Sequence, residues 1–308
     1  MQRGSAPVTA AAPRVGRSRS RRWGGIVIVL VALVAIWEAA KWLGGDPWRL
    51  HGTIAGVAVD YEHIPPLDWR IASDLSLPHV WDIGRAFVEP AQRGGAPLGV
   101  VLAGQAAFTF AEALAGFVLG ALLGLGLGVT FVHSRLAERA FVPYVVASQT
   151  VPILAIAPLV VVALKADWLS VMAVATYLTF FPVTIASMRG LRAFDPRALE
   201  LFRSYAATRR QVLWQLRLPT SVPYLFSGFR VAAAASVIGA IIGEQTAGVA
   251  SGLGSAIINY NQYYTSGPER LWATIVMCTL VGFVFVGIVN LAERLLTRGR
   301  YRPVEGML

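Results

Sequence analysis

Two groups of residues in this 308-residue chain have the types and spacing to do chemistry. One is the arginine-rich stretch ELFRSYAATRRQVLWQLRLP, residues 200–219, which lies between two long apolar runs. The other is a set of ionisable side chains within or at the ends of apolar runs: Glu38, Glu112, Arg230 and Glu244. A charge inside a membrane is costly and is by default a candidate for function. Each of these charges also has a structural explanation, which we favour, such as reaching the membrane interface from a helix end.

The composition indicates that the apolar runs cross a membrane. Hydrophobic residues make up 56% of the chain, charged residues only 14%, and the mean hydropathy is +0.58. Runs of about twenty apolar residues, enough to cross about 30 Å of hydrocarbon, lie near residues 24–43, 110–132, 141–164, 168–188, 222–243 and 271–292. We therefore predict an all-α integral membrane protein with six transmembrane helices.

The basic residues indicate how the helices are oriented. Nineteen of the 27 Lys and Arg residues fall in segments 1–23, 133–140, 189–221 and 294–308, which share one side of the membrane. By the positive-inside rule both termini and residues 200–219 are cytoplasmic, in a bacterial cytoplasmic membrane. Because the charge is spread out, it argues against a nucleic-acid site. A cleaved signal peptide is the alternative for the basic N-terminus, but no small-x-small cleavage site follows it.

The chain lacks the motifs of an enzyme. It has no HExxH metal pair, no GxSxG nucleophile turn and no GxxxxGK[ST] loop to cradle ATP. Its single cysteine, Cys278, excludes an intramolecular disulfide and a thiolate pair for a metal. We expect no catalytic residue, cofactor or metal. The alternatives from other classes are an intramembrane enzyme and a self-sufficient secondary carrier, of which the carrier requires broken midplane helices that the hydropathy does not show.

The remaining segments divide as follows. Residues 44–97 form an outside loop, where apolar spacing over 77–89 predicts a helix along the membrane surface, and residues 44–76 have no assignment. Residues 98–293 form a core of five further helices with the cytoplasmic segment 189–221, and residues 294–308 form a tail. The second span carries small residues every four positions, at which another helix can approach closely: Gly116, Gly120, Gly124 and Gly128.

The cytoplasmic segment predicts a helix–turn–helix. Asp195 can cap a helix that begins at Pro196, and its apolar face would be Ala198, Leu201, Phe202 and Tyr205. Thr208 and Gln211 have the spacing of a capping box, which starts a second helix ending near Arg217. Pro219 and Pro223 then break the pattern, and Pro223 is placed to open the fifth span. Such an element could dock a soluble partner, lie on anionic lipid or stay solvated.

The same stretch resembles the EAA motif of binding-protein-dependent ABC transporter permeases, E-A-A, three residues, G, nine residues, I-x-L-P. Glu200, Ala206, Leu216, Leu218 and Pro219 keep its register. Further likeness to the nitrate, sulfonate and taurine branch, which also includes importers of thiamine precursors and riboflavin, comes from WE at 37–38, LP at 77–78, QTVPILAIAPL at 149–159, FFP at 180–182, SGLG at 251–254 and LAER at 291–294. The resemblance covers roughly residues 26–300, apart from 44–76.

The resemblance implies a type I ABC importer permease fold and a set of partners. These are a cytoplasmic ATPase dimer, an extracytoplasmic solute-binding protein and a second permease subunit, with a homodimer favoured over a heterodimer. By this likeness the 200–219 segment is a coupling helix gripped by the ATPase, whose closure around ATP drives alternating access. The residues assigned to ATPase docking are Glu200, Tyr205, Ala206, Arg209, Gln211, Leu218 and Pro219, of which Tyr205, Arg209 and Gln211 are added by position alone.

Two features depart from or extend the family pattern. The glycine of the motif is Ala206 here, and if the turn keeps a positive φ, alanine costs on the order of 1 kcal/mol. The translocation path should be lined mainly by spans three to five. The polar side chains there that could contact a passing solute are Gln149, Thr150, Tyr177 and Thr179. Polar side chains in spans also hydrogen-bond one helix to another, which is the alternative role for these four.

Overall fold

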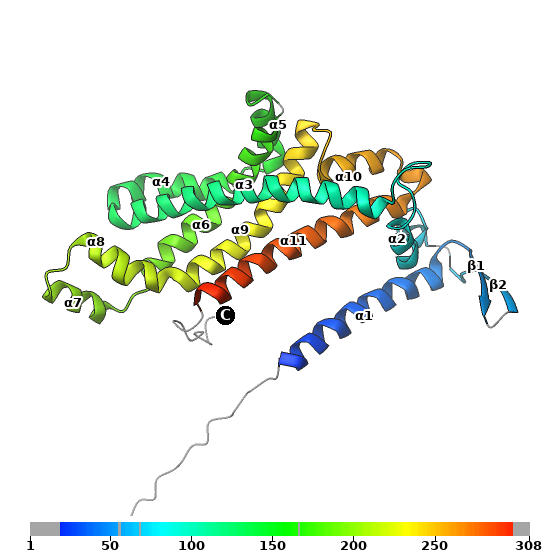
Figure 1. Ribbon diagram of the computed structural model, residues 1–308, viewed down its shortest axis with the longest axis horizontal. Helices are drawn as coiled ribbons and strands as arrows, with labels where there is room; N and C mark the ends of the chain where they lie inside the picture. The colour runs from blue at the N-terminus through cyan, green and yellow to red at the C-terminus, as the bar shows by residue number, and fades with distance from the viewer. Residues whose placement is uncertain (1–18, 55–56, 68, 166, 298–308) are drawn as a thin grey trace, which may run out of the picture. The chain divides into compact units, whose positions relative to one another are not determined.

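The computed structural model describes residues 19–54, 57–67, 69–165 and 167–297 (Figure 1). It divides into two compact units, residues 1–80 and 81–308, which are treated separately below. Among the described residues, five helices are long and apolar enough to cross a membrane, and a sixth span results if two helices joined by a sharp bend count as one.

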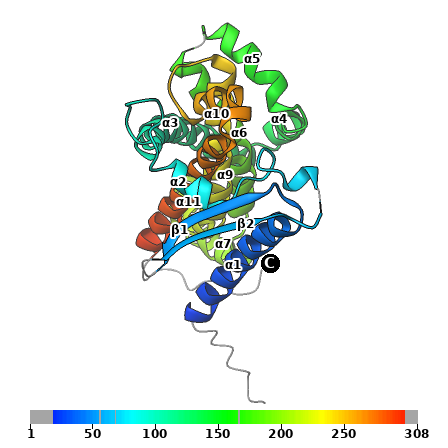
Figure 2. The same cartoon turned by 90° about the vertical axis from the view of Figure 1, so that its right-hand side faces the viewer.

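The N-terminal unit consists of a long helix followed by a β-hairpin. Helix α1 (Arg19–Gly44) carries apolar side chains that are exposed from Val27 to Ile36, as in a helix that contacts lipid. Strands β1 (Trp48–Ile54) and β2 (Val57–His63) pair antiparallel, with Trp48 opposite His63 (Figure 2). A short 3₁₀ helix, η1 (Arg70–Ala72), follows. The hairpin occupies part of the segment for which the sequence provided no assignment.

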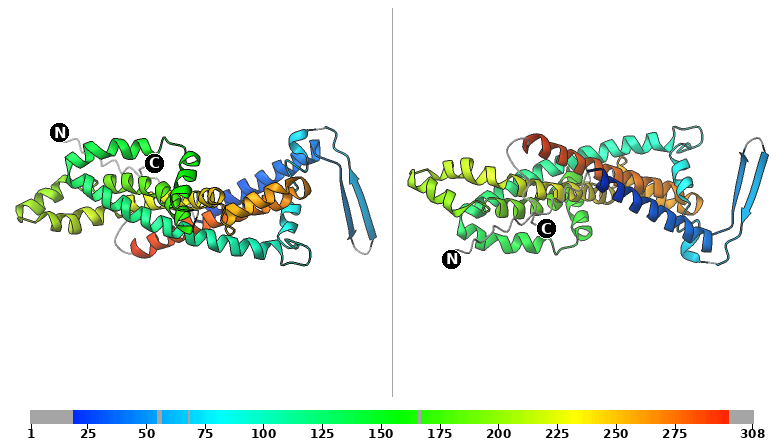
Figure 3. Two further views of the ribbon diagram at one scale, coloured as in Figure 1. Left: turned by 90° about the horizontal axis from the view of Figure 1, so that it is seen from above. Right: turned by 90° about the horizontal axis from the view of Figure 1, so that it is seen from below.

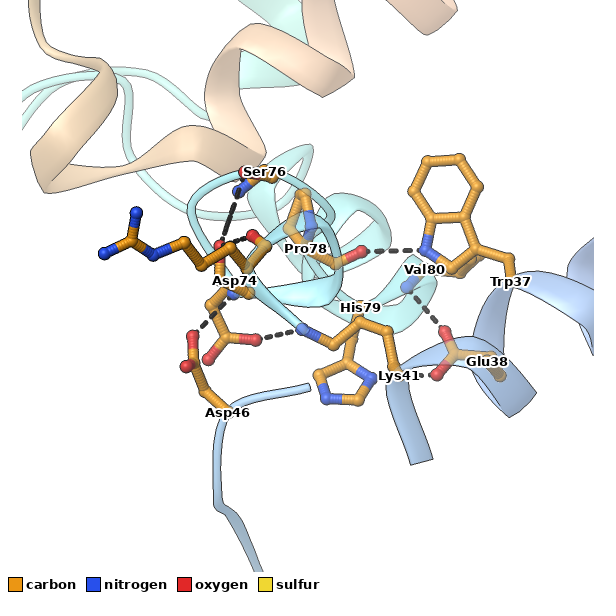
Figure 4. A network of polar contacts seen from close by, with 11 residues as sticks. Trp37, Glu38, Lys41, Asp46, Asp74, Ser76, Pro78, His79 and Val80 are labelled. Atoms are coloured by element: carbon orange, nitrogen blue, oxygen red, sulfur yellow. Dashed lines mark hydrogen bonds and ion pairs between the residues drawn. The ribbon is translucent and has the colours of Figure 1, made fainter. Parts of the chain in front are cut away.

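Polar contacts tie the end of α1 to residues 74–80 (Figure 4). Glu38 accepts hydrogen bonds from the backbone N–H of Val80 and from Nδ1 of His79, both at 2.8 Å. Lys41 is fully buried and forms an ion pair with Asp74. Glu38 therefore caps the start of helix α2 (Val80–Ala86), which lies inside the predicted surface helix over 77–89. This role is structural, but it differs from the expected one, in which Glu38 reaches the membrane interface.

The core of the second unit is a layer in which α6 (Trp168–Gly190) packs against both α3 (Leu98–His133) and α9 (Leu218–Ala247). The glycine ridge of α3 makes this contact. A Cβ atom added at Gly120 would lie 2.5 Å from Cβ of Thr179, and one added at Gly124 would lie 2.6 Å from the carbonyl oxygen of Phe180. The second span thus begins at Leu98, twelve residues before the predicted 110, and its glycines serve close packing as expected.

Helices α10 (Leu253–Gln262) and α11 (Pro268–Thr297) complete this unit, with the 3₁₀ turn η3 (Tyr264–Ser266) between them. The Phe285 ring of α11 packs on Phe110 and Phe117 of α3, with ring centroids 5.1 and 5.3 Å apart. Arg230 on α9 forms an ion pair with Glu293 on α11 at 2.5 Å. Arg230 was expected to reach the membrane interface, and the structure instead pairs it with a carboxylate of another helix.

The predicted third span, 141–164, is not one helix. Helices α4 (Arg135–Ser148) and α5 (Ile153–Ala163) are bent by 100° at a four-residue break. Pro152 has no N–H group to continue the ladder, and the Thr150 hydroxyl bonds to the carbonyl of Ala147 at 2.7 Å instead. The hydropathy of 141–164 could not show this break, because the residues on both sides of it are mainly apolar.

Candidate functional site

The segment between α6 and α9 begins with helix α7 (Pro196–Ser204). Asp195 caps it, since its Oδ1 accepts a hydrogen bond from the backbone N–H of Arg197 at 2.9 Å, as predicted. Two residues of the predicted apolar face are uncovered in the single chain: Leu201 is 56% exposed and Tyr205 is 79% exposed. These two apolar side chains therefore form an uncovered surface on α7.

Helix α7 ends in a turn that places Ala206 at φ +48°. The backbone N–H of Ala207 bonds to the carbonyl of Phe202, and that of Ala206 bonds to the carbonyl of Arg203, both at 3.0 Å. This pair of bonds defines a Schellman motif, whose left-handed position is usually glycine. The turn expected at Ala206 is thus kept, although the residue there is alanine.

The next helix starts at the predicted capping box. The backbone N–H of Thr208 donates to Oε1 of Gln211 at 2.7 Å, and the N–H of Gln211 donates to the Thr208 hydroxyl at 3.3 Å. Helix α8 (Arg209–Gln211) passes into the π-helical turn η2 (Val212–Arg217) and then directly into α9.

The predicted break at Pro219 and Pro223 is wrong, because the helix is continuous from Arg209 to Ala247. In η2 the N–H of Leu218 bonds to the carbonyl of Leu213, five residues back, which widens this turn of the helix. Pro219 follows directly after the widened turn. The Thr220 hydroxyl adds a hydrogen bond to the carbonyl of Leu216 at 2.8 Å, within this continuous helix. The arginine-rich segment is therefore built rigidly onto the membrane helix α9.

A basic groove separates α7 and α8 from the end of α3. It encloses about 350 Å³ and is lined by Val132, His133, Leu199, Arg203, Ala207, Arg209, Val212 and Arg217. The Arg217 guanidinium lies 4.9 Å from the centre of the Phe194 ring, a cation–π contact. No carboxylate lines the groove, so a negatively charged group of a partner would be attracted there.

An ion pair holds this region against α4. Arg192, in the loop before α7, donates two hydrogen bonds to Glu138, at 2.9 and 2.7 Å. These bonds favour the charged guanidinium and raise the pKa of Arg192. The pair was not predicted, since nothing in the sequence links two exposed charges so far apart.

The path candidates separate into two places. Gln149 and Thr150 are exposed in the break between α4 and α5, and the Tyr177 hydroxyl on α6 donates to the carbonyl of Ser148 beside them. Thr179 is fully buried, bonds to the carbonyl of Ala175 at 2.8 Å and packs on Gly120. Thr179 therefore packs one helix against another, which was the alternative role given for the four path candidates.

Comparison with known families identifies the architecture. Residues 116–298 match the family described as binding-protein-dependent transport system inner membrane component. The chain belongs to this family. The permease is 31% identical to the riboflavin transport system permease protein RibX of Chloroflexus aurantiacus, over 95% of this chain and 97% of that protein. It is 34% identical to the formylaminopyrimidine transport permease protein ThiX of Halalkalibacterium halodurans, over 59% of this chain and 71% of that protein.

A solved structure shares this fold. An inward-facing structure of the MetNI methionine ABC transporter aligns with a TM-score of 0.51 at 18% identity, over 73% of this chain and 99% of that one. The permease is accordingly an inner-membrane transport subunit of a binding-protein-dependent ABC importer with the type I permease fold. This confirms the family that the EAA register and the other motifs indicated.

Sequence reasoning missed three features of the permease. Trp214 is 62% exposed beside the predicted docking residues, and its type could have marked it as an interface anchor. Arg203 and Arg217 line the basic groove, which needs the folded turn to form. Glu112 and Glu244, treated separately in the sequence, are both fully buried where α3, α9 and α10 meet.

Proposed function

We propose that residues 200–219 are the site at which a cytoplasmic ATPase dimer drives this permease. The observation that supports this is an exposed apolar and basic surface, with Leu201, Tyr205 and Trp214 uncovered, next to a helix that runs unbroken from Arg209 into α9. Aromatic and arginine side chains are the usual anchors of protein interfaces. A rotation imposed on α7 and α8 would therefore be transmitted into the membrane core.

Within this segment the predicted docking residues have distinct parts. Glu200 and Arg209 are exposed and supply charge for contacts with the ATPase, and Tyr205 supplies apolar area. Ala206 and Gln211 shape the turn, because one occupies its left-handed position and the other closes the capping box. Leu218 and Pro219 are half-buried at the start of α9, so they belong to the rigid connection.

Cross-linking tests this docking. In a Cys278→Ser background, the thiol of Tyr205→Cys should be joined to the co-expressed ATPase by a short thiol-reactive cross-linker. The yield of this cross-link should change between the ATP-bound and ATP-free states. Ser227→Cys, exposed on α9 within the membrane span, is the matched control and should give no cross-link. Equal cross-linking at both positions, or none at Tyr205→Cys in either state, would contradict the assignment.

The break between α4 and α5 supports a translocation path at Gln149, Thr150 and Tyr177. Backbone that is not helical can lie at membrane depth only where protein covers it or where it lines a water-filled cavity. Gln149 and Thr150 are exposed in this chain, so a second permease subunit and the path between the two subunits would cover them. A homodimer is the simplest assembly of this kind.

This assembly has its own test. Thr150→Cys in the Cys278→Ser background should cross-link into a dimer of this chain in membranes, and solute should protect it from a water-soluble thiol reagent. A chain that stays monomeric, with Thr150→Cys unreactive to the reagent, would contradict both the homodimer and the path. The extracytoplasmic partner is proposed to be a solute-binding protein, whose affinity for riboflavin, formylaminopyrimidine, aliphatic sulfonates and nitrate would identify the solute class.

A further inference from the structure

Two fully buried carboxyl groups face each other in the core of the second unit, and the proposed function uses neither of them. Glu112 lies in the middle of α3 and Glu244 lies near the end of α9, and both side chains are 0% exposed. Thr109, one turn before Glu112 on α3, accepts a hydrogen bond from the N–H of Leu253, and the adjacent N–H of Gly254 donates to Glu244, so the two carboxyl groups meet at this junction. No N–H or O–H group of the described residues donates to either oxygen of Glu112 or to Oε1 of Glu244.

The surroundings of the two groups differ. Oε2 of Glu244 accepts a hydrogen bond from the backbone N–H of Gly254 at 2.6 Å, at the first turn of α10. The neighbouring N–H groups of Gly252 and Leu253 donate to Gln105 and Thr109 of α3. Glu244 therefore caps a helix N-terminus, where the helix dipole and the N–H group stabilise a negative charge. Glu112 has no such donor.

No cation compensates the pair. From α6, Val171 and Ala175 pack on α9 at Gly243 and Gly239 and bring no charge. From α11, the titratable group that interacts with Glu244 is the Cys278 thiol, while Arg270 donates to the carbonyl of Ala91. The described residues contain no ion pair to Glu112 or Glu244. Two adjacent carboxylates without a counter-charge cannot both be ionised at this depth.

We propose that Glu112 is held in its protonated form and donates an O–H hydrogen bond to the Glu244 carboxylate, so that the pair is a proton-binding site joining α3, α9 and α10. Helix α10, whose first turn Glu244 caps, lies on the side of the second unit away from α7 and α8 (Figure 3). The close fit of the α9–α10 turn supports the site, since a Cβ atom added at Gly252 would lie 2.3 Å from the Glu244 carboxyl carbon. Loss of the proton would place two negative charges together and separate α3 from this turn.

The pH dependence of stability tests this site. An unfolded glutamate titrates near pH 4.3, so above that pH the folded chain binds one more proton than the unfolded chain, and stability falls as pH rises until the folded pair titrates. The wild-type Tm, measured on the purified full chain in detergent, should fall relative to that of Glu112→Gln by about 2–4 °C for each pH unit between pH 5 and 8. The glutamine amide can donate to Glu244 at every pH. Parallel Tm profiles of the two proteins would overturn the proposal.

Two further measurements separate this site from other causes. Infrared spectra of the wild type at pH 8 should contain the C=O band of a protonated carboxyl, which Glu112→Gln removes. A wild type without the band, or a band of equal size in the variant, would overturn the proposal even if the variant were poorly stable. Cys278→Ser should leave both the band and the pH dependence unchanged, since the thiol only neighbours the pair.

Discussion

Arg192 donates two parallel hydrogen bonds to Glu138, from Nη1 to Oε1 at 2.9 Å and from Nη2 to Oε2 at 2.7 Å. The pair joins the first turn of α4 to the loop that precedes α7. Both side chains are partly exposed, so the pair contributes little to stability. Its planar, two-bond geometry instead fixes where the coupling segment leaves the core.

Charge exchange tests this positioning role. Glu138→Arg and Arg192→Glu should each lower ATP-driven uptake several-fold and cost less than about 1 kcal/mol in stability. The double variant restores an ion pair and should recover most of the uptake, measured in vesicles with matched expression. A double variant as inactive as the worse single variant would argue against positioning by this pair.

The left-handed residue of the α7 turn predicts a stabilising substitution. Ala206→Gly should raise stability by about 1 kcal/mol, because glycine adopts the φ of +48° without steric cost. Thermal unfolding of the purified chain measures the change. Ala207→Gly, one residue later at a position without positive φ, is the control and should bring no gain. Equal shifts for both variants would mean that backbone strain is absent at Ala206.

The α3 ridge predicts opposite effects for two nearby glycines. Gly124→Ala places a Cβ 2.6 Å from the carbonyl oxygen of Phe180, so it should lower stability by about 1–3 kcal/mol. Gly126→Ala meets no atom within 4 Å and should be neutral or stabilising by up to about 1 kcal/mol. Thermal unfolding of both variants in one detergent compares them directly. A reversed order of stability would contradict the α3–α6 packing.

The sequence predicted the helix starts that depend only on a few neighbouring residues. Asp195 before Pro196, and Thr208 three residues before Gln211, each satisfy N–H groups at a helix start, which is a property of a few consecutive residues. The register of Glu200, Ala206 and Pro219 likewise singled out residues 200–219, for which docking of an ATPase is proposed. These features need no knowledge of the rest of the fold.

The features that were missed depend on tertiary contacts or on local compensation. Pro219 and Pro223 read as helix breakers, yet the helix runs unbroken through both from Arg209 to Ala247, with the widened turn η2 just before Pro219. The break after Ser148 is held by Tyr177 from another helix, which the apolar run cannot reveal. The hairpin in residues 48–63 was overlooked, although Val57, Val59 and Tyr61 alternate as in a strand.

The exposed carboxylate of the coupling segment predicts a specific loss of the partner. Glu200→Arg should reduce co-purification of the ATPase at least tenfold while expression and Tm stay unchanged, because Glu200 is exposed on α7 and makes no ion pair among the described residues. Glu89→Arg makes the same charge change at an exposed site remote from α7 in the chain. That control should co-purify the ATPase normally. Intact co-purification in Glu200→Arg would remove Glu200 from the interface.

Uptake by the purified permease in liposomes tests the central claim most directly. With its ATPase, its binding protein and ATP, the wild type should accumulate solute, and Glu200→Arg should reduce the rate to that of liposomes without ATP. The wild type without the ATPase should transport nothing. Transport by the permease alone, or full ATP-driven uptake by Glu200→Arg, would contradict the claim that residues 200–219 couple this membrane core to a separate ATPase.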